Sequence, residues 1–181
     1  MTDLIAVQAL LQDSFGRVRE SVVEVTQALT ADVSTYRPDE QANSVSWLVW
    51  HLTRVQDDHV AGVAGVDQVW PHWRDRFGLP FDEFETGYGQ SPAEVAEVRA
   101  SAELLSGYHE DVHAMTERYL ASLSESDLDR VVDRRWDPPV TVGVRLVSVL
   151  GDCMQHLGQA AYVRGLAERA RPAAGVSAQG G

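Results

Sequence analysis

The spacing of apolar residues constrains this chain more than any other feature of its sequence. From about Asp3 to Ala31, apolar side chains recur at intervals of three, four and seven residues. They are Leu4, Val7, Leu11, Phe15, Val18, Val22 and Leu29. These intervals put them on one face of an α-helix, and that face must be buried against other elements. The pattern therefore predicts an amphipathic helix over about 3–31, and Pro38 prevents it from continuing.

Three further segments show the same period, over about 44–65, 91–123 and 142–168. The second of them begins with a capping signature, because Ser91 precedes a proline and is followed three residues later by Glu94. Each segment is long enough for five or more helical turns. The chain is therefore expected to contain four long helices.

Two long connectors separate these helices, and neither keeps a helical period. Residues 66–90 hold prolines, glycines and many aromatic residues, a composition and length typical of functional lids. Residues 124–141 form the other connector, and no alternating strand pattern is visible. The sequence predicts an all-α four-helix bundle over 1–168, with long connections between the second and third helices and between the third and fourth. The tail, 169–181, lacks an apolar period and is expected to be disordered.

Composition excludes several classes of function. The chain has 181 residues and a formal net charge of -12, so its surface should repel nucleic-acid phosphates. No run approaches the ~20 apolar residues needed to cross a bilayer, and no signal-peptide pattern is present. The single cysteine, Cys153, cannot form an internal disulfide and is expected to be a small buried apolar residue. A cytoplasmic protein without membrane or nucleic-acid partners is therefore expected.

The stretch His109-Glu110-Asp111-Val112-His113 matches the H-E-x-x-H pattern of zinc proteases. Such a site needs a third protein ligand, and the residues that follow supply neither a further histidine nor a supporting motif. His109 falls on the apolar stripe of its helix, whereas Glu110 points away from it. A chance match within a packing helix is the favoured interpretation, and a protease is the least favoured.

A different set of residues offers a better metal site. His51 lies on the apolar face of the second helix, where a histidine that stands alone is most often a satisfied core residue. Asp152 and His156 are four residues apart and therefore lie on one face of the fourth helix. Together the three side chains would supply three ligands to a divalent cation and leave positions open, as catalytic metal sites do.

Two further residues are candidates for catalytic roles beside this site. Arg145 lies seven residues before Asp152 on the same helix face and could hold an anionic group of a substrate, although pairing with a surface carboxylate is the alternative. Asp58 lies seven residues after His51, although it and Asp57 could simply be solvated. His59 is a weaker candidate, because it lies about 80° away from the face of His51.

Two segments also resemble a known family. "RPDEQANSVSWLVWHLTRVQDDHVAG" and "DCMQHLGQAAYVRG" are similar to sequences of the DinB/YfiT-like superfamily of metal-binding helical bundles. The most specific parts are N-S-x-x-W-L-x-W-H, ending at His51, and H-x-G-Q, beginning at His156. The resemblance extends from the first helix to about Leu166. It implies a DinB-type bundle with His51, Asp152 and His156 as metal ligands. Many members have histidine where this chain has Asp152, and the carboxylate resembles the site of mycothiol-dependent maleylpyruvate isomerase.

The resemblance implies a function as well. Actinobacterial relatives are thiol S-transferases that use mycothiol, and a composition rich in arginine without lysine fits such a source. The implied activity is a divalent-metal-dependent mycothiol S-transferase, in which the metal lowers the pKa of the thiol and a thiolate attacks an electrophile. Zinc is the expected metal, and nickel or manganese would also suit the ligands. The substrates would be a small-molecule thiol and an electrophile, with Arg145 and the 66–90 segment positioning them.

Three alternatives stay open. A metal-dependent isomerase or hydrolase could use the same ligands, because their geometry does not choose among reactions. A non-catalytic stress protein could retain the metal site. A homodimer formed through bundle faces is compatible with the sequence, which indicates no particular stripe for it.

Overall fold

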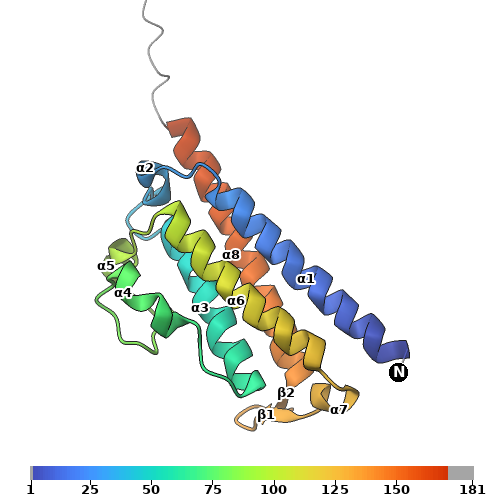
Figure 1. Cartoon of the computed structure of the whole chain (residues 1–181). Coiled ribbons are helices and arrows are strands. Elements are labelled where there is room, and N and C mark those ends of the chain that lie inside the picture. Colours follow the sequence, from blue (N-terminus) through green and yellow to red (C-terminus); the bar gives the residue numbers. More distant parts are fainter. Residues whose placement is uncertain (1, 171–181) are drawn as a thin grey trace, which may run out of the picture.

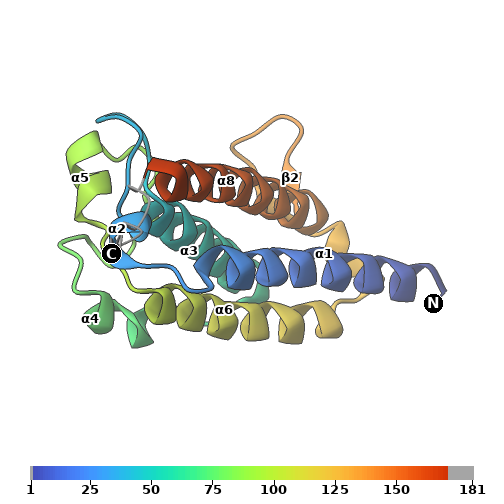
Figure 2. The same ribbon diagram turned by 90° about the horizontal axis from the view of Figure 1, so that it is seen from above.

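The structure is a computed structural model that describes residues 2–170, with side chains from residue 4 onward. Four long helices lie alongside one another and form the body of the molecule (Figure 1). They are α1 (Thr2–Thr26), α3 (Val45–Ala64), α6 (Ala102–Ser122) and α8 (Val142–Ala170). Seen from above, α1 lies between α6 and α8, and α3 lies behind α1 (Figure 2). The prediction of an all-α four-helix bundle is confirmed.

Short elements join the long helices. They are α2 (Ala31–Ser34), the 3-10 helix η1 (Trp70–His72), α4 (Arg74–Phe77), α5 (Pro92–Glu97), α7 (Glu125–Leu128), β1 (Val131–Asp133) and β2 (Val140–Thr141). The two strands pair antiparallel, with Val131 opposite Thr141. Sequence periodicity did not predict this hairpin, because strands of three and two residues are too short to show alternation.

The single helix expected over 91–123 is two helices, α5 and α6, so that prediction was wrong. The extended backbone between them has its polar groups satisfied by side chains from elsewhere in the chain. The Ala100 N–H donates to Ser46 Oγ over 2.7 Å, and its carbonyl accepts from Ser34 Oγ over 3.1 Å. Ser101 then caps α6 by accepting from the Leu104 N–H. Because the break depends on these distant serines, the local sequence does not reveal it.

Two predicted helix ends also differ from the structure. The first helix ends at Thr26 rather than near Ala31, and Ala28 adopts a positive φ of 52° beyond it. The last helix extends to Ala170, so residues 169 and 170 of the expected disordered tail are helical. The rest of that tail, 171–181, lies outside the described residues.

Helix α3 is the most enclosed of the four, with fifteen of its twenty residues buried. Three helices cannot surround a fourth completely, and its remaining side is covered by the 66–90 segment, where Trp70 and Phe81 pack against Trp50 of α3. This cover explains why polar residues of α3, including His51, are buried. Within residues 2–170, no helix combines the length and apolarity needed to cross a membrane.

Candidate metal centre

Three side chains from two neighbouring helices converge between α3 and α8. His51 comes from α3, and Asp152 and His156 come from successive turns of α8. Each can offer one ligand atom, and these three atoms all lie within 4.8 Å of one another. The two imidazole rings stand edge to face with their centroids 4.6 Å apart. Among the described residues, this is the one group of three such side chains close enough to share an ion.

Both histidines are oriented by backbone carbonyls. Nδ1 of His51 lies 2.5 Å from the Thr86 carbonyl oxygen, and Nδ1 of His156 lies 2.9 Å from that of Asp152. A carbonyl oxygen only accepts, so each Nδ1 carries the proton and each Nε2 keeps its lone pair. Donation of the second ring N–H to a carbonyl is the usual arrangement for a metal-binding histidine.

The carboxylate of Asp152 has an unsatisfied oxygen. Its Oδ2 is buried and makes no hydrogen bond to any described residue. Nδ1 of His156 lies 3.3 Å from it but directs its proton to the backbone carbonyl of Asp152 instead. An unpaired buried carboxylate oxygen is costly, and a cation would satisfy it. Two imidazole nitrogens and one carboxylate oxygen form a donor set that suits zinc, nickel or manganese.

The charges of the three groups are coupled. Burial lowers the pKa of His51, which favours the neutral ligand form. Burial also opposes ionisation of Asp152, but His156 and His51 outweigh it, and the pKa of that carboxyl lies below its usual value. The contact with Asp152 raises the pKa of His156 despite partial burial. Without a metal, the site therefore holds a carboxylate that attracts positive charge.

The segment after Phe81 covers the centre closely at Gly87. Trp47 stacks on His51 with ring centroids 4.6 Å apart, and its Nε1 donates to Gln90 Oε1 over 2.8 Å. Gly87 has a φ of 98°, and a Cβ there would lie 2.9 Å from Nδ1 of His51 and 3.0 Å from Trp50. Only glycine allows both this backbone conformation and the close approach that brings the Thr86 carbonyl to His51.

The variant Gly87→Ala is expected to weaken metal binding by about 10- to 100-fold, the usual cost of losing a ligand's hydrogen-bond partner. The methyl group would push the Thr86 carbonyl away from His51. Gly89→Ala is the matched control, because Gly89 also has a positive φ, 77°, but has open space around it. Competition with a fluorescent zinc chelator would measure both affinities. Equal losses in the two variants would contradict the role of the close approach.

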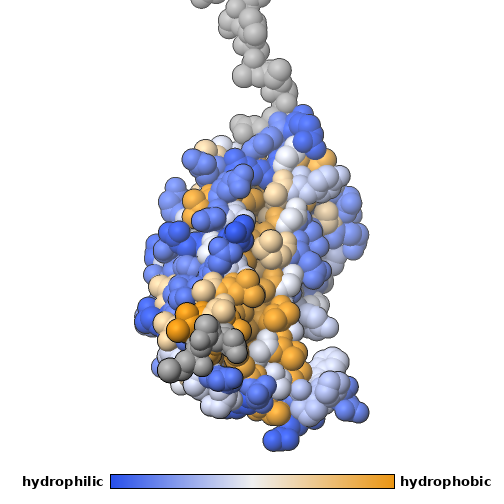
Figure 3. Space-filling view, turned by 90° about the vertical axis from the view of Figure 1, so that its right-hand side faces the viewer, coloured by the Kyte–Doolittle hydropathy of each residue, from blue (hydrophilic) through white to orange (hydrophobic). Residues whose placement is uncertain are grey.

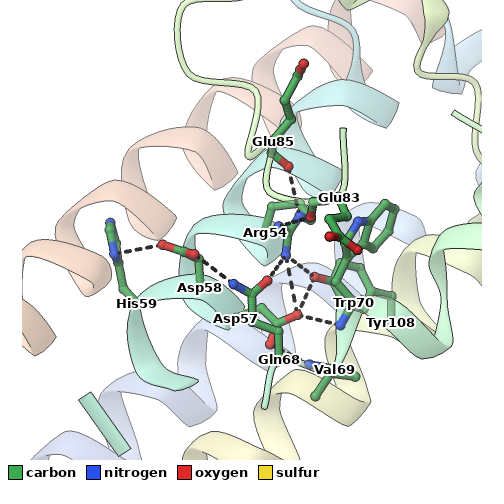
Figure 4. A network of polar contacts seen from close by, with 10 residues as sticks. All are labelled: Arg54, Asp57, Asp58, His59, Gln68, Val69, Trp70, Glu83, Glu85 and Tyr108. Atoms are coloured by element: carbon green, nitrogen blue, oxygen red, sulfur yellow. Dashed lines mark hydrogen bonds and ion pairs between the residues drawn. The ribbon is translucent and has the colours of Figure 1, made fainter. Parts of the chain in front are cut away.

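A buried network anchors the rest of the covering segment to α3 (Figure 4). Arg54, one turn beyond His51, is fully buried. Its guanidinium donates to the carbonyls of Glu85 over 3.0 Å and Glu83 over 3.3 Å, and to Gln68 Oε1 over 2.8 Å. It also lies over the ring of Trp70, 5.1 Å from the centroid. Arg54 therefore holds the segment that carries Thr86 in place.

Asp57 is the second member of this network and is not the solvated residue that the sequence suggested. It is fully buried and accepts from the backbone N–H groups of Val69 and Trp70 and from the Tyr108 hydroxyl, over 2.7–2.9 Å. Burial raises its pKa, while these bonds and Arg54 lower it, and the net shift is upward. Sequence reasoning missed this pair; the available signal was an arginine and an aspartate three residues apart on the same helix.

Arg145 and Asp58 line one cavity, and their contacts are with residues other than His51, Asp152 and His156. Arg145 Nη2 is 3.6 Å from Asp133, and Nη1 is 3.5 Å from both ring nitrogens of His59. Asp58 accepts from Gln68 Nε2 over 2.8 Å and lies 3.3 Å from His59 Nδ1. The hydrogen bond with His59 is the largest of the influences that lower the pKa of Asp58. The structure thus pairs Arg145 with a carboxylate, and the catalytic roles of both residues stay predictions.

A cavity of about 290 Å³ lies between α3, α8 and β1. Its lining consists of Asp58, His59, Gly62, Val63, Val132 and Arg145. Asp58 is seven residues after His51 and Arg145 is seven residues before Asp152, so these two cavity residues lie about 10 Å along the helices from the centre. A molecule bound in the cavity would have to extend over that length to reach the three converging residues.

The H-E-x-x-H residues do not belong to this centre. His109 is buried, with its Nδ1 3.3 Å from Thr53 Oγ1, and burial lowers its pKa to about 3. Glu110 is half-exposed and pairs with Arg19 of α1 over 2.6 Å. A zinc protease would need that glutamate beside a water, whereas here an arginine holds it. The structure gives this stretch a packing role.

Neutral burial of His109 should make folding stability depend on pH. The folded pKa of His109 lies below its unfolded value. The stability that depends on keeping this residue neutral is therefore complete above about pH 6.5 and is lost as the pH falls toward about 3. Protonation linked to this residue should lower the free energy of unfolding by about 2 kcal/mol between pH 7 and pH 5. Urea unfolding at the two pH values should show a smaller difference in His109→Gln than in the wild type. Replacement of the exposed His72 by glutamine is the control; equal pH dependence in all three proteins would contradict the prediction.

Comparisons with known proteins agree with this geometry. The family model described as mycothiol S-transferase matches residues 10–168. A crystal structure described as a conserved protein from Enterococcus faecalis shares 35% sequence identity, covers 90% of this chain and 98% of that one, and superposes with a TM-score of 0.83. No curated protein matches the chain. The family match includes all four long helices in whole or in large part and all three converging residues. The chain therefore belongs to the mycothiol S-transferase family, with the DinB-like helical bundle that its sequence predicted.

Proposed function

We propose that the protein is a divalent-metal-dependent thiol S-transferase that conjugates mycothiol to small electrophiles, with His51, Asp152 and His156 as metal ligands. The observation that carries the proposal is the convergence of their three ligand atoms within 4.8 Å, in a chain of this family. A second observation supports the proposal: the buried Oδ2 of Asp152 has no hydrogen-bond partner among the described residues. Zinc is the expected metal.

A cation at this centre would lower the pKa of a coordinated thiol and supply a thiolate at neutral pH. The residues around it would orient the ligands. Carbonyls hold the Nδ1 atoms of His51 and His156, so the Nε2 atom of each ring would be the one to bind the cation. In the reaction, the sulfur would form a bond to the electrophilic carbon, the leaving group would depart with the electron pair of the broken bond, and the thiol proton would pass to solvent.

The cavity between α3, α8 and β1 would hold part of a substrate. Arg145 offers a guanidinium at its wall, and Asp58 offers an ionised carboxylate that accepts hydrogen bonds. These groups suit a polyhydroxylated thiol such as mycothiol, whose hydroxyls can both donate and accept. We assign Arg145 and Asp58 to substrate positioning, and substitution of Arg145 by methionine would test this by a rise in KM for the thiol.

The proposal is tested by incubating the zinc-loaded protein with mycothiol and monobromobimane and separating the conjugate by chromatography. We expect conjugate formation well above the uncatalysed rate, and slower conjugation of glutathione or free cysteine. A rate equal to the background with every thiol would contradict transferase function. In that case, turnover of maleylpyruvate or ester substrates would favour an isomerase or a hydrolase.

A further inference from the structure

The solvent-facing side of α8 carries no charge over five turns. Of the helix positions from Val144 to Tyr162, ten are exposed, and none of them is acidic or basic. They are Val144, Val147, Ser148, Gly151, Met154, Gln155, Gly158, Gln159, Ala161 and Tyr162. Val147 and Tyr162 are 65% and 66% exposed, values that mark large apolar surfaces left open to water. Such a neutral face is unusual in a chain with a net charge of -12.

Apolar residues gather along one side of the molecule, the side on which α1 forms the edge of the bundle. Figure 3 shows them as a strip with hydrophilic residues on both flanks. On α1, Ile5 and Leu10 are 67% and 66% exposed. Between α1 and α8 runs a groove of about 590 Å³, lined by apolar residues such as Leu157 and Ala161 and also by charged residues of both helices. Contiguous apolar surface with polar flanks is typical of a protein contact site.

We propose that this face binds a second copy of the chain, with the two α8 helices packed antiparallel about a two-fold axis. Two acidic molecules repel one another wherever charged surfaces meet, and a neutral face removes that penalty. Interface centres are also depleted in charged residues. The absence of charge on this face would therefore allow two acidic chains to associate through it.

The spacing of large and small residues fits this packing. Exposed positions 144, 147, 151, 154, 158 and 161 follow intervals of three and four residues, as in helices that pack along their length. In an antiparallel pair centred between positions 152 and 153, each large side chain meets a small one from the second copy. The facing pairs are Met154 with Gly151, Val147 with Gly158 and Val144 with Ala161.

The glycines give independent support. Glycine inside a helix costs about 1 kcal/mol relative to alanine and needs a reason. A Cβ at Gly151 or Gly158 would meet no described atom of the chain within 4 Å, so packing within one molecule does not require either residue. Close approach of a second α8 would require both.

The helix face alone is too small for a stable dimer. At 1.5 Å per residue and a width of about 10 Å, it offers roughly 300 Å² per copy, whereas stable interfaces bury about 800 Å² per partner. The groove between α1 and α8 adjoins the same face and supplies further area, although Glu24, Arg164 and Glu168 also line it. The proposed contact therefore includes α1, with Val144 and Val147 of one copy lying over the groove of the other.

Sedimentation velocity of the wild type and of two variants tests the proposal. Val147→Arg places a charge in the middle of the face, and Val23→Arg is the matched control, an exposed valine beside α6 on another side of the bundle. At tens of micromolar, we expect the wild type and Val23→Arg to sediment with twice the 19.9 kDa mass of one chain. Val147→Arg should sediment as a monomer with an unchanged circular dichroism spectrum.

Two outcomes would overturn the proposal. One is a wild-type protein that stays monomeric at these concentrations, which would leave the face to a different partner or to another part of the chain. The other is a dimer that Val147→Arg leaves intact or that Val23→Arg dissociates, because the contact would then lie elsewhere. Gly158→Arg checks the same face at the position expected to oppose Val147 and should also give a monomer.

Discussion

Replacement of His156 by alanine is expected to remove the metal and, with it, mycothiol conjugation. The variant loses one of only three protein ligands and leaves the buried Oδ2 of Asp152 without a counter-charge. Disturbing a hydrogen-bond partner of a ligand already costs about 10- to 100-fold in affinity, so loss of the ligand itself should exceed ~100-fold. Metal analysis of purified protein should give about one zinc per chain in the wild type and almost none in the variant.

His113→Ala is the control for this result. It removes a histidine of similar burial from the H-E-x-x-H stretch, which the structure keeps apart from the three converging residues. We expect it to retain metal and activity. Loss of zinc from His113→Ala with normal zinc in His156→Ala would show that the metal lies on α6 after all, and the site assigned between α3 and α8 would be wrong.

Replacement of Arg54 by methionine should destabilise the fold more than any other single change to a polar residue of α3. Its guanidinium has no exposed surface, contacts Asp57 at 3.5 Å and binds the carbonyls of Glu83 and Glu85. Methionine would leave Asp57 buried without its cation and the two carbonyls without donors. Breaking one partner of a buried ion pair costs about 3–5 kcal/mol, and urea unfolding at pH 7 would measure the loss.

Arg17→Met provides the comparison, because it also breaks an arginine–aspartate pair. That pair is at the surface, with the side chains of Arg17 and Asp13 68% and 58% exposed, so its removal should change stability little. The Arg54 variant should also bind zinc more weakly, since the segment carrying Thr86 would be released. An Arg54 variant as stable as the Arg17 variant would show that the covering segment does not depend on the network.

The four helices were predictable because each buries a long apolar stripe, and such a stripe needs only the local sequence to be seen. The capping box at Ser91 was predictable for the same reason, since both partners lie within four residues. The break between α5 and α6 was not, because Ser46 and Ser34 stabilise it from more than fifty residues away. The β1–β2 hairpin is too short to leave a pattern.

The three converging residues were partly predictable. Asp152 and His156 are a local pair on one helix face, their grouping with His51 followed from comparing helix faces, and the resemblance to a known family implied the same three residues. The groups that support the ligands left weaker signals. The Thr86 carbonyl, the close approach of Gly87 and the buried Arg54–Asp57 pair all depend on how a segment of irregular backbone folds over α3. The position of His51 and Arg54 on an apolar helix face indicated that each needs a hydrogen-bond partner, but the sequence did not indicate which group would supply it.

The metal dependence of mycothiol conjugation tests the central claim most directly. Zinc-loaded protein, protein stripped with a chelator and then dialysed, and stripped protein to which zinc is returned should be compared at equal concentration. We expect conjugation to fall to the background rate after stripping and to recover when zinc is restored. Stripped protein that conjugates mycothiol as fast as the zinc-loaded protein would contradict the account, because the three converging residues would then have no part in activating the thiol.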